Sequence, residues 1–363
     1  MNEEEELGIV RESIDNIDRQ IQELLSERAE AAKEIARIKL SADPNAIFYR
    51  PDREAQVLKQ VKKLNKGPLD DEKMARLFRE IMSACLSLEN PLNIAFLGPA
   101  GTFTQAAALK HFGNSVRTEP MGSIPDVFME VEAGTANYGV VPIENSTEGV
   151  VNHTLDMFLK SSLQICGEVS LRIHQNLLVK DEMKDLREVK TIYSHQQSFA
   201  QCRGWLDRHL PYVERIAVGS NAEAANLVAK SVHSAAIASD TAAALYNLNT
   251  LAVNIEDEPG NMTRFLVIGS HTTASSGDDK TSLVLSTKNE AGGLYRMIKP
   301  LSDNGVSMTR IESRPSRRGN WDYVFFIDII GHRNDSNVSK ALAELRSAAG
   351  MYKELGSYPQ AVL

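Results

Sequence analysis

The sequence contains 363 residues, of which 42% are hydrophobic, 24% charged and 6% aromatic. These proportions are typical of a globular protein, the length favours about three domains, and no apolar run approaches the roughly 18 residues of a membrane helix. The net charge of −8 argues against nucleic-acid binding. The N-terminus lacks the pattern of a signal peptide, and the three scattered cysteines indicate reduced thiols, so we expect a cytoplasmic protein.

The first stretch predicts a long packed helix, because apolar residues recur every three or four positions from residue 10 to residue 38. The series is Val10, Ile14, Ile17, Ile21, Leu24, Ala31, Ile35 and Ile38. Arg28 interrupts it, and Lys39 lies within roughly 20° of Arg28 around the helix axis. Arg11 points about 100° away, so it needs a second subunit to reach the same pocket. The alternative is that Arg28 extends to solvent at the edge of the seam.

Two further helices are expected before residue 91. One begins at Pro51 and carries Arg53 and Glu54, and the other runs from about residue 70 and places Cys85 and Glu89 one turn apart. Three helices of one chain cannot cover so long an apolar seam. The pattern therefore predicts a dimeric helical bundle with polar sites inside.

This segment, residues 1–91, resembles the all-helical chorismate mutase domain. The residues that carry the resemblance are Arg11, Arg28, Lys39, Arg53, Glu54, Cys85 and Glu89. It implies a site shared by two intertwined subunits, in which chorismate rearranges to prephenate. Arg11 and Arg28 would bind the two carboxylates, with Lys39 at the ether oxygen and the pair at 53 and 54 along the ring. Such a rearrangement needs only a compact substrate conformer and well-placed charges.

Two residues of this segment depart from the family pattern. Cys85 and Glu89 stand where a serine and a glutamine are expected. A glutamate beside an ether oxygen helps only when it is protonated, and a helix C-terminus already disfavours its anion. We therefore predict mutase activity favoured at acidic pH. The alternative is a solvated glutamate at the end of a helix.

After Pro91 short apolar runs alternate with turns and helical stretches, which is typical of an α/β domain. A strand at 93–97 leads through a glycine-rich turn into a helix that begins near Thr102, where backbone N–H groups suit a carboxylate better than a phosphate. Strands ending near residues 142 and 193 are followed by polar turns at Glu144-Asn145-Ser146 and Ser194-His195 with Gln197. The carboxyl ends of such strands bind ligands, although helix capping and a structural histidine remain alternatives.

Residues 260–265 form a turn that carries Thr263 and Arg264 into a strand. With the motifs at 98–104, 142–146 and 194–197, it resembles prephenate dehydratase over about residues 92–271. The resemblance implies two α/β lobes, as in periplasmic-type binding proteins, with the second lobe, about 171–255, inserted in the first. The prephenate-binding residues that it implies are Thr102, Glu144, Asn145, Ser146, Ser194, Gln197, Thr263 and Arg264. Thr263 would donate a hydrogen bond or proton to the departing hydroxyl, and Arg264 would fix a carboxylate or brace the turn.

Residues 272–279 read as a small polar linker, and residues 280–363 follow the order β-α-β-β-α-β of a ferredoxin-like domain. Pro300 should kink or end the first helix. With Ala291-Gly-Gly-Leu294 at the start of that helix and Glu312-Ser-Arg-Pro315 at the end of the second strand, the segment resembles the ACT regulatory domain, which implies phenylalanine binding between subunits. The implied residues are Ala291, Gly292, Gly293, Leu294, Glu312, Ser313 and Arg314, with Gly293 in place of the usual alanine. The alternative is a dimerisation module without a ligand.

Together the resemblances imply a multidomain enzyme of phenylalanine biosynthesis that converts chorismate through prephenate to phenylpyruvate and is inhibited by L-phenylalanine. Neither reaction requires a metal or cofactor, and no cysteine–histidine cluster has metal-binding spacing. We expect a homodimer or tetramer with no nucleic-acid or membrane partner. A non-catalytic anion-binding protein and an arogenate dehydratase are the two alternatives.

Overall fold

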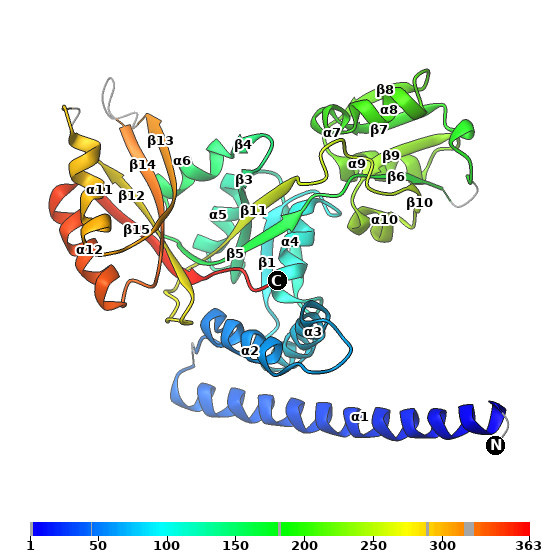
Figure 1. Ribbon diagram of the computed structural model, residues 1–363, viewed down its shortest axis with the longest axis horizontal. Helices are drawn as coiled ribbons and strands as arrows, with labels where there is room; N and C mark the ends of the chain where they lie inside the picture. The colour runs from blue at the N-terminus through cyan, green and yellow to red at the C-terminus, as the bar shows by residue number, and fades with distance from the viewer. Residues whose placement is uncertain (1–2, 45, 181–182, 288–289, 316–322) are drawn as a thin grey trace.

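The computed structural model describes residues 3–44, 46–180, 183–287, 290–315 and 323–363. A helical segment is followed by two α/β lobes and then by a sheet covered by two helices (Figure 1), which is the predicted order. None of the helices in these ranges combines the length and apolarity needed to cross a membrane. The same residues contain no group of three or more His, Cys, Asp or Glu side chains arranged to hold a metal ion.

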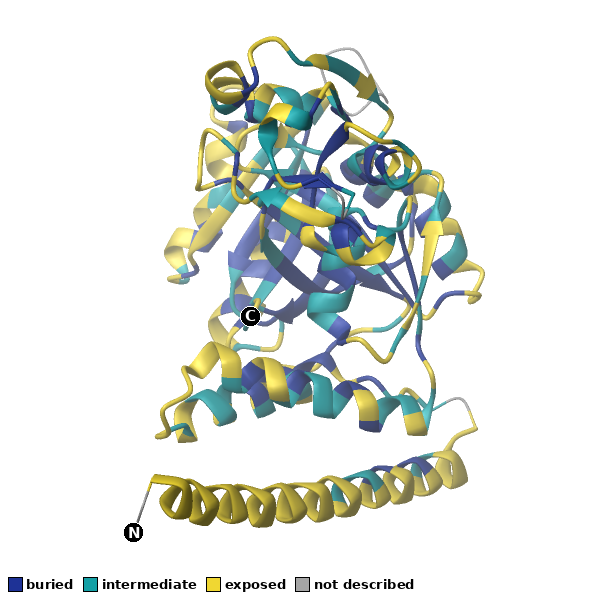
Figure 2. Ribbon diagram, turned by 90° about the vertical axis from the view of Figure 1, so that its right-hand side faces the viewer, coloured by how far each residue is buried: buried dark blue, intermediate teal, exposed yellow. Residues whose placement is uncertain are grey.

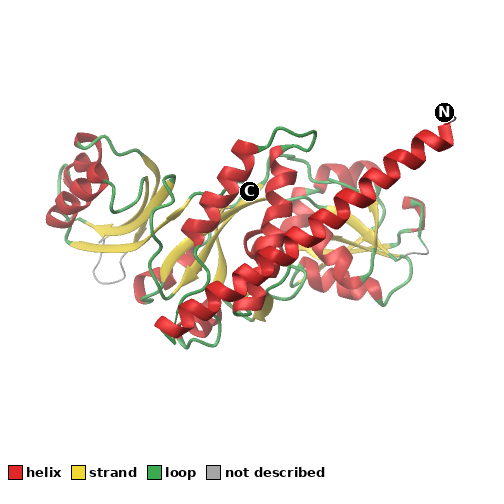
Figure 3. Cartoon of the chain, turned by 90° about the horizontal axis from the view of Figure 1, so that it is seen from below, coloured by secondary structure: helices red, strands yellow, loops and turns green. Residues whose placement is uncertain are grey.

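The helical segment contains α1 (Glu3–Ala42), α2 (Pro51–Leu64) and α3 (Asp71–Glu89). Pro51 occupies the first position of α2, and the side chain of Asp70 accepts a hydrogen bond from the N–H of Lys73 at the start of α3. The 40 residues of α1 span about 60 Å. Its only buried residues are Ala32 and Ala36, and most of the helix is exposed (Figure 2). Seen from below, α1 crosses the underside of the molecule (Figure 3). Most of its apolar seam is therefore uncovered in a single chain.

The first α/β lobe is built on a sheet in the order β2-β1-β3-β11-β5, with β4 paired to β3. Its strands are β1 (Asn93–Leu97), β2 (Arg117–Met121), β3 (Tyr138–Asn145), β4 (Gly149–Val150), β5 (Gln164–Arg172) and β11 (Met262–Gly269). Its helices are α4 (Phe103–Phe112), α5 (Ile124–Glu132) and α6 (Asn152–Lys160). β1 runs parallel to β2 and β3, whereas β11 lies antiparallel between β3 and β5.

The second lobe is inserted between β5 and β11, so the chain crosses between the lobes twice. Its sheet has the order β10-β6-β9-β7-β8. Its elements are β6 (Asn176–Val179), η1 (Leu186–Glu188), β7 (Thr191–His195), α7 (Gln196–Gln201), α8 (Arg203–His209), β8 (Glu214–Val218), α9 (Asn221–Ala229), β9 (Ser234–Ala238), α10 (Asp240–Tyr246) and β10 (Asn249–Ala252). The sequence pattern did not indicate β2, β4, β5, β6, β8 and β10. Of these, β2 and β8 are edge strands without a buried residue.

The C-terminal sheet has the order β13-β14-β12-β15 and all its pairs are antiparallel. Its elements are β12 (Asp279–Ser286), α11 (Gly293–Asp303), β13 (Met308–Pro315), β14 (Tyr323–Ile330), α12 (Ser336–Ala348) and β15 (Met351–Pro359). The predicted β-α-β-β-α-β order is confirmed. Pro300 does not end α11, which continues to Asp303, because a proline in the last turn removes only one helical N–H.

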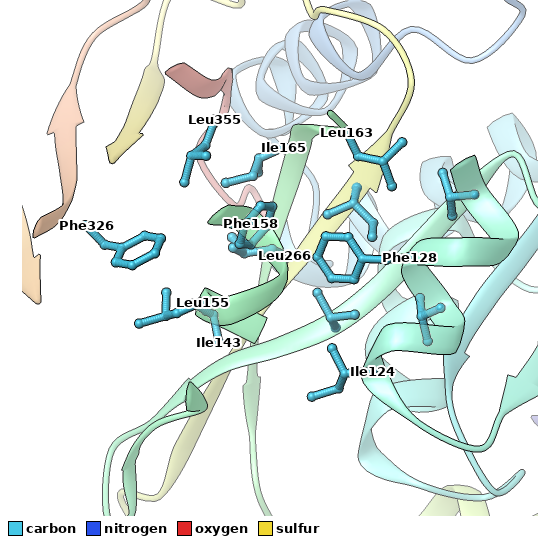
Figure 4. Packing of buried hydrophobic residues seen from close by; sticks show 14 of the residues in the cluster. Ile124, Phe128, Ile143, Leu155, Phe158, Leu163, Ile165, Leu266, Phe326 and Leu355 are labelled. Carbon is cyan, nitrogen blue, oxygen red and sulfur yellow. The ribbon is translucent and has the colours of Figure 1, made fainter. Parts of the chain in front are cut away.

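The C-terminal sheet is packed on both faces. One face packs on α11 and α12 through residues such as Leu283 and Ile327. The other face shares a hydrophobic core with the first lobe, in which Phe326 and Leu355 lie near Phe158 (Figure 4). This shared core fixes the third domain against the sheet that carries β3 and β11.

The segment 272–279, predicted as a polar linker, is ordered and partly buried. The carboxylate of Asp279 accepts hydrogen bonds from the hydroxyls of Ser275 and Ser276, at 2.9 and 2.7 Å. Asp279 also begins β12. Because its small side chains bond to a buried carboxylate, this segment is a packed connection and does not behave as a loose spacer.

Candidate functional sites

The helical segment forms an open cavity of about 320 Å³ beside α1, α2 and α3. The predicted residues that line it are Arg28, Arg53, Glu54, Cys85 and Glu89. Apolar side chains such as Ile35, Val57 and Met82 complete the wall. Three arginines, Arg28, Arg50 and Arg53, and two carboxyl groups therefore line one partly apolar space.

The other two residues predicted for this site lie outside the cavity. The ammonium group of Lys39 lies 3.3 Å from the carbonyl oxygens of both Ile47 and Phe48, and 5.4 Å from the centre of the Phe48 ring. Because Phe48 lines the cavity, Lys39 stands at its rim. Arg11 is exposed and precedes Arg28 by 17 residues, which is about 25 Å along the helix axis. It cannot reach the cavity of its own chain.

Burial and nearby positive charge act in opposite directions on the pKa of Glu89, the last residue of α3. Burial raises the pKa of Glu89, and the opposing attraction of Lys39 and Arg28 does not cancel that shift. The predicted direction is confirmed. Its cause is burial in the cavity wall, whereas the sequence argument invoked the helix terminus.

Arg79 is a residue of this region that the sequence prediction missed. Its guanidinium lies 2.9 Å from the carboxylate of Glu54, and both side chains are nearly buried. Burial raises the pKa of Glu54, while Arg79 opposes that rise. The only signal in the sequence is an arginine beside the apolar stripe of α3.

The two α/β lobes face each other across a cleft of about 350 Å³. Four of the predicted residues line it: Thr102, Asn145, Gln197 and Thr263. The other polar side chains in its lining are Thr104, Gln175, His195, Ser198, Gln201, Ser220, Asn221, Ser239 and Asn261. The cleft is therefore rich in uncharged hydrogen-bonding groups.

Thr263 is nearly buried and lies beside the side-chain amides of Asn145 and Asn261. The Nδ2 group of Asn145 donates to Thr263 Oγ1 at 2.7 Å and to Asn261 Oδ1 at 2.8 Å. Because Thr263 Oγ1 accepts this hydrogen bond, its own proton is free to be donated into the cleft. Asn261 keeps a buried Nδ2 group with no hydrogen-bond partner among the described residues. The signal for Asn261 was its place two residues before Thr263, just ahead of β11.

A β-bulge determines which face of the sheet the side chains at the end of β3 take. Thr263 pairs with Asn145 and Arg264 with Glu144, but Phe265 pairs with Pro142, so one residue of β3 is extra. The extra residue reverses the alternation of side chains beyond it. Asn145 therefore points into the cleft beside Thr263, and its neighbour at position 144 points to the opposite face.

Four residues predicted to bind prephenate do not line the cleft. Glu144 lies 3.2 Å from Arg310 of β13, and Arg264 pairs with Glu168 and Asp328, because both side chains point to the rear face of their strands. This position of Arg264 supports the bracing alternative. The remaining two, Ser146 and Ser194, are supporting residues.

Ser146 and Ser194 hold cleft residues in place. The hydroxyl of Ser146 accepts from the N–H of Met262 at 2.9 Å and donates to Asn261 at 3.4 Å. Ser194 is fully buried and donates to Asn221 Oδ1 at 3.1 Å, which leaves the amide of Asn221 facing Ser198 at 2.8 Å. Their hydroxyls are occupied by protein partners.

The described lining of the cleft contains neither arginine nor lysine. Two helix N-termini, which favour anions, meet the cleft, since Thr102 precedes α4 and Ser220 precedes α9. Gly101, with a φ of +88°, allows a close approach between the lobes, because an added Cβ would lie 3.3 Å from Leu245. This environment suits a carboxylate, as the sequence indicated for the turn at 98–101.

The residues predicted for the regulatory site lie on two elements. Residues 291–294 lead into α11, where Gly292 has a φ of +74°. Glu312, Ser313 and Arg314 lie on the edge strand β13, and Arg314 donates to Asp156 of α6 at 2.7 Å. The guanidinium of residue 314 is therefore engaged with the first lobe, while Ser313 on the opposite face is exposed.

Comparison with known proteins identifies each segment. Residues 10–90 match chorismate mutase type II, residues 94–273 match prephenate dehydratase, and residues 281–347 match the ACT domain. Among solved structures, the prephenate dehydratase from Arthrobacter aurescens in complex with L-Phe is 35% identical with a TM-score of 0.68, covering 74% of this chain and 90% of that one. The prephenate dehydratase of Staphylococcus aureus is 25% identical with a TM-score of 0.65, covering 74% and 100%.

The fold and the two cavities thus define an enzyme in which a mutase domain and a dehydratase domain are fused to a regulatory domain. The bifunctional chorismate mutase/prephenate dehydratase of Stutzerimonas stutzeri is 57% identical over 366 residues, and that of Pseudomonas aeruginosa is 55% identical, each with 100% of both chains covered. The chain belongs to the family of bifunctional chorismate mutase/prephenate dehydratases.

Proposed function

We propose that residues 1–91 convert chorismate to prephenate in a cavity completed by a second subunit. Arg28 and Arg53 line that cavity, and Lys39 stands at its rim. Arg11 of the other chain would supply the remaining cation, because it lies too far along α1 to serve its own cavity. Fixed cations of this kind hold the substrate's carboxylates and stabilise the charge that develops on the ether oxygen. Cys85 and the ring-side residues Arg53 and Glu54 would complete the wall.

The exposed apolar seam of α1 supports a homodimer formed by this helix. Val10, Ile14, Ile17 and Ile21 are each about half exposed, which a stable monomer rarely tolerates over such a length. A second copy of the same helix would cover them. A tetramer would follow if the C-terminal domains also pair.

We propose that residues 92–271, with the inserted lobe at about 171–255, convert prephenate to phenylpyruvate in the cleft. The reaction breaks the C–O bond of the ring hydroxyl and the bond to one carboxylate, which releases water and carbon dioxide. Thr263 would supply the hydrogen bond or proton to the departing oxygen, because its hydroxyl accepts from Asn145 and can donate outward. Thr102, Gln197 and Asn261 would bind the polar groups of the substrate.

The experiment that tests this assignment is the Thr263→Ala variant. We expect it to lose phenylpyruvate formation by at least 100-fold, in the range typical of removing a proton donor, while the rearrangement of chorismate is unchanged. Thr263→Ser should retain part of the dehydratase activity, because it keeps the hydroxyl. Loss of both activities, or of neither, would contradict separate sites.

We further propose that residues 280–363 bind L-phenylalanine and inhibit the enzyme. The support is the ACT match and the L-Phe complex of the Arthrobacter aurescens enzyme. The segments 291–294 and 312–314 would contribute to that site between subunits. We propose a cytoplasmic location, because the three cysteines are buried free thiols.

A further inference from the structure

The paired strands β3 and β11 present two faces to two different domains. On the front face, Thr263 and Asn145 meet across the pair and line the cleft. On the rear face, Arg264 and Glu144 stand opposite each other in the same register. The bulge in β3 produces this arrangement, because without its extra residue Thr263 would stand opposite Glu144 in place of Asn145. The rear face meets the C-terminal domain.

Arg264 is tied to the C-terminal domain by a buried network. Its guanidinium donates to Asp328 of β14 at 2.5 Å and to the hydroxyl of Tyr358 at 3.0 Å, and it donates to Glu168 of β5 at 2.8 Å. Lys280 of β12 completes the network at 2.9 Å from Glu168. Burial lowers the pKa of Arg264, but Tyr358, Asp328 and Glu168 together outweigh it and keep the group charged. The network holds two cations and two carboxylates, so its charges balance.

Glu144 is tied to the same domain by a second link. Arg310 of β13 places its Nε 3.2 Å from the Glu144 carboxylate, and the Arg310 side chain is only 11% exposed. Glu144 and Arg264 are the sequence neighbours of Asn145 and Thr263, which share a hydrogen bond. Each of these two neighbours therefore has an ionic partner in the C-terminal domain. The two links enter from different strands, β13 and β14, of one sheet.

We propose that Arg310 and Asp328 are positioning residues for the dehydration reaction, which act through Glu144 and Arg264 to set the relative placement of Thr263 and Asn145. Adjacent residues of a strand are joined by a planar peptide, so a shift of one moves the other. Misplacement of a reacting group by about 1 Å can cost 100-fold in rate. The inference rests on the proposed role of Thr263. It gives the regulatory domain a route to the cleft through space, in addition to the chain connection at 272–279.

The test is a set of variants assayed for both activities in the full-length enzyme. Arg310→Met should lower the kcat of phenylpyruvate formation about tenfold, with the KM for prephenate changed less than twofold and mutase activity unchanged. Asp328→Asn should act in the same direction. Arg310→Lys should restore part of the rate, because it restores the charge. Glu144→Gln combined with Arg310→Met should cost no more than the larger single effect, since the pair acts as one unit.

Arg333→Met is the matched control. Arg333 also pairs with a carboxylate at 3.2 Å, that of Glu354, but the pair lies within the C-terminal domain. A wild-type kcat in Arg310→Met, an equal loss in Arg333→Met, or additive losses in the double variant would each overturn the proposal. Wild-type enzyme that formed no phenylpyruvate from prephenate would instead overturn the proposed function itself.

Discussion

At the scale of single residues, the position of each side chain in the two sites follows from alternation along a strand or periodicity along a helix. Asn145 and Thr263 share the front face of β3 and β11 because of one extra residue in β3. Glu144 and Arg264, each one position away, lie on the rear face for the same reason. In the helical cavity, Glu89 ends α3 beside Arg28 and becomes partly buried there.

The raised pKa of Glu89 leads to a prediction about pH. A carboxyl that donates a hydrogen bond to the ether oxygen must be protonated, so mutase activity is present below the raised pKa and is lost as pH rises through it. Above that pKa, kcat/KM should fall about tenfold per pH unit. Glu89→Gln should remove this limb and remain active at pH 8, as measured by the loss of chorismate absorbance. Identical pH profiles of wild type and variant would show that Glu89 takes no part in the rearrangement.

At the scale of elements, α1 decides how the mutase site is assembled. Arg28 lies near its C-terminal third, where Ala32 and Ala36 are buried and α1 packs on α3. Arg11 lies about 25 Å away on the exposed part. The two arginines of the proposed mutase site therefore lie far apart on one helix, and a symmetric dimer would bring Arg11 of one chain to Arg28 of the other.

Subunit complementation follows from that geometry. Arg11→Ala and Arg28→Ala should each lose mutase activity by at least tenfold, because each removes a carboxylate partner. After exchange of subunits in an equal mixture, about one quarter of all sites should be intact, because each mixed dimer has one complete site. The assay is mutase activity of the mixture.

The control mixes Arg28→Ala with Lys39→Ala. Both residues are assigned to the same chain's half of the site, so every site of the mixed dimer lacks one of them. No activity should return. Recovery in this control, or none in the first mixture, would argue against a site shared as proposed.

At the scale of the whole molecule, the C-terminal domain touches both catalytic segments. Its sheet shares a hydrophobic core with the dehydratase lobe (Figure 4), and β15 leads into a tail that reaches the mutase helices. Lys62 of α2 donates to the carbonyl of Val362 at 2.6 Å. A change in this domain can therefore bear on two active sites.

Phenylalanine binding gives the prediction at this scale. A ligand that binds only the folded protein stabilises it, by about 2.7 kcal/mol at a free concentration 100 times its Kd. L-Phenylalanine should raise the Tm in differential scanning fluorimetry and lower the rate of phenylpyruvate formation. D-Phenylalanine serves as the control for nonspecific effects. If the L-isomer changed neither the Tm nor the rate, the C-terminal domain would be a dimerisation module only.

The sequence by itself determined the order of the three segments, the helices of the first, the order of helices and strands in the last, and half of the proposed dehydratase residues. Local periodicity within short stretches of sequence predicts three features. They are the long apolar seam, the β-α-β-β-α-β order and the placement of Thr263. Thr102, Asn145 and Gln197 were also found because they lie where strands of the two sheets end or the following helices begin.

Only the tertiary structure decided which face each polar residue takes and what it meets there. The bulge in β3 sends Glu144 to Arg310, 166 positions later in the chain, and Arg264 meets Asp328 across two domains. Arg79 was missed because its partner Glu54 lies on another helix. Such contacts depend on register and on the packing of distant segments, and no local pattern encodes either of them.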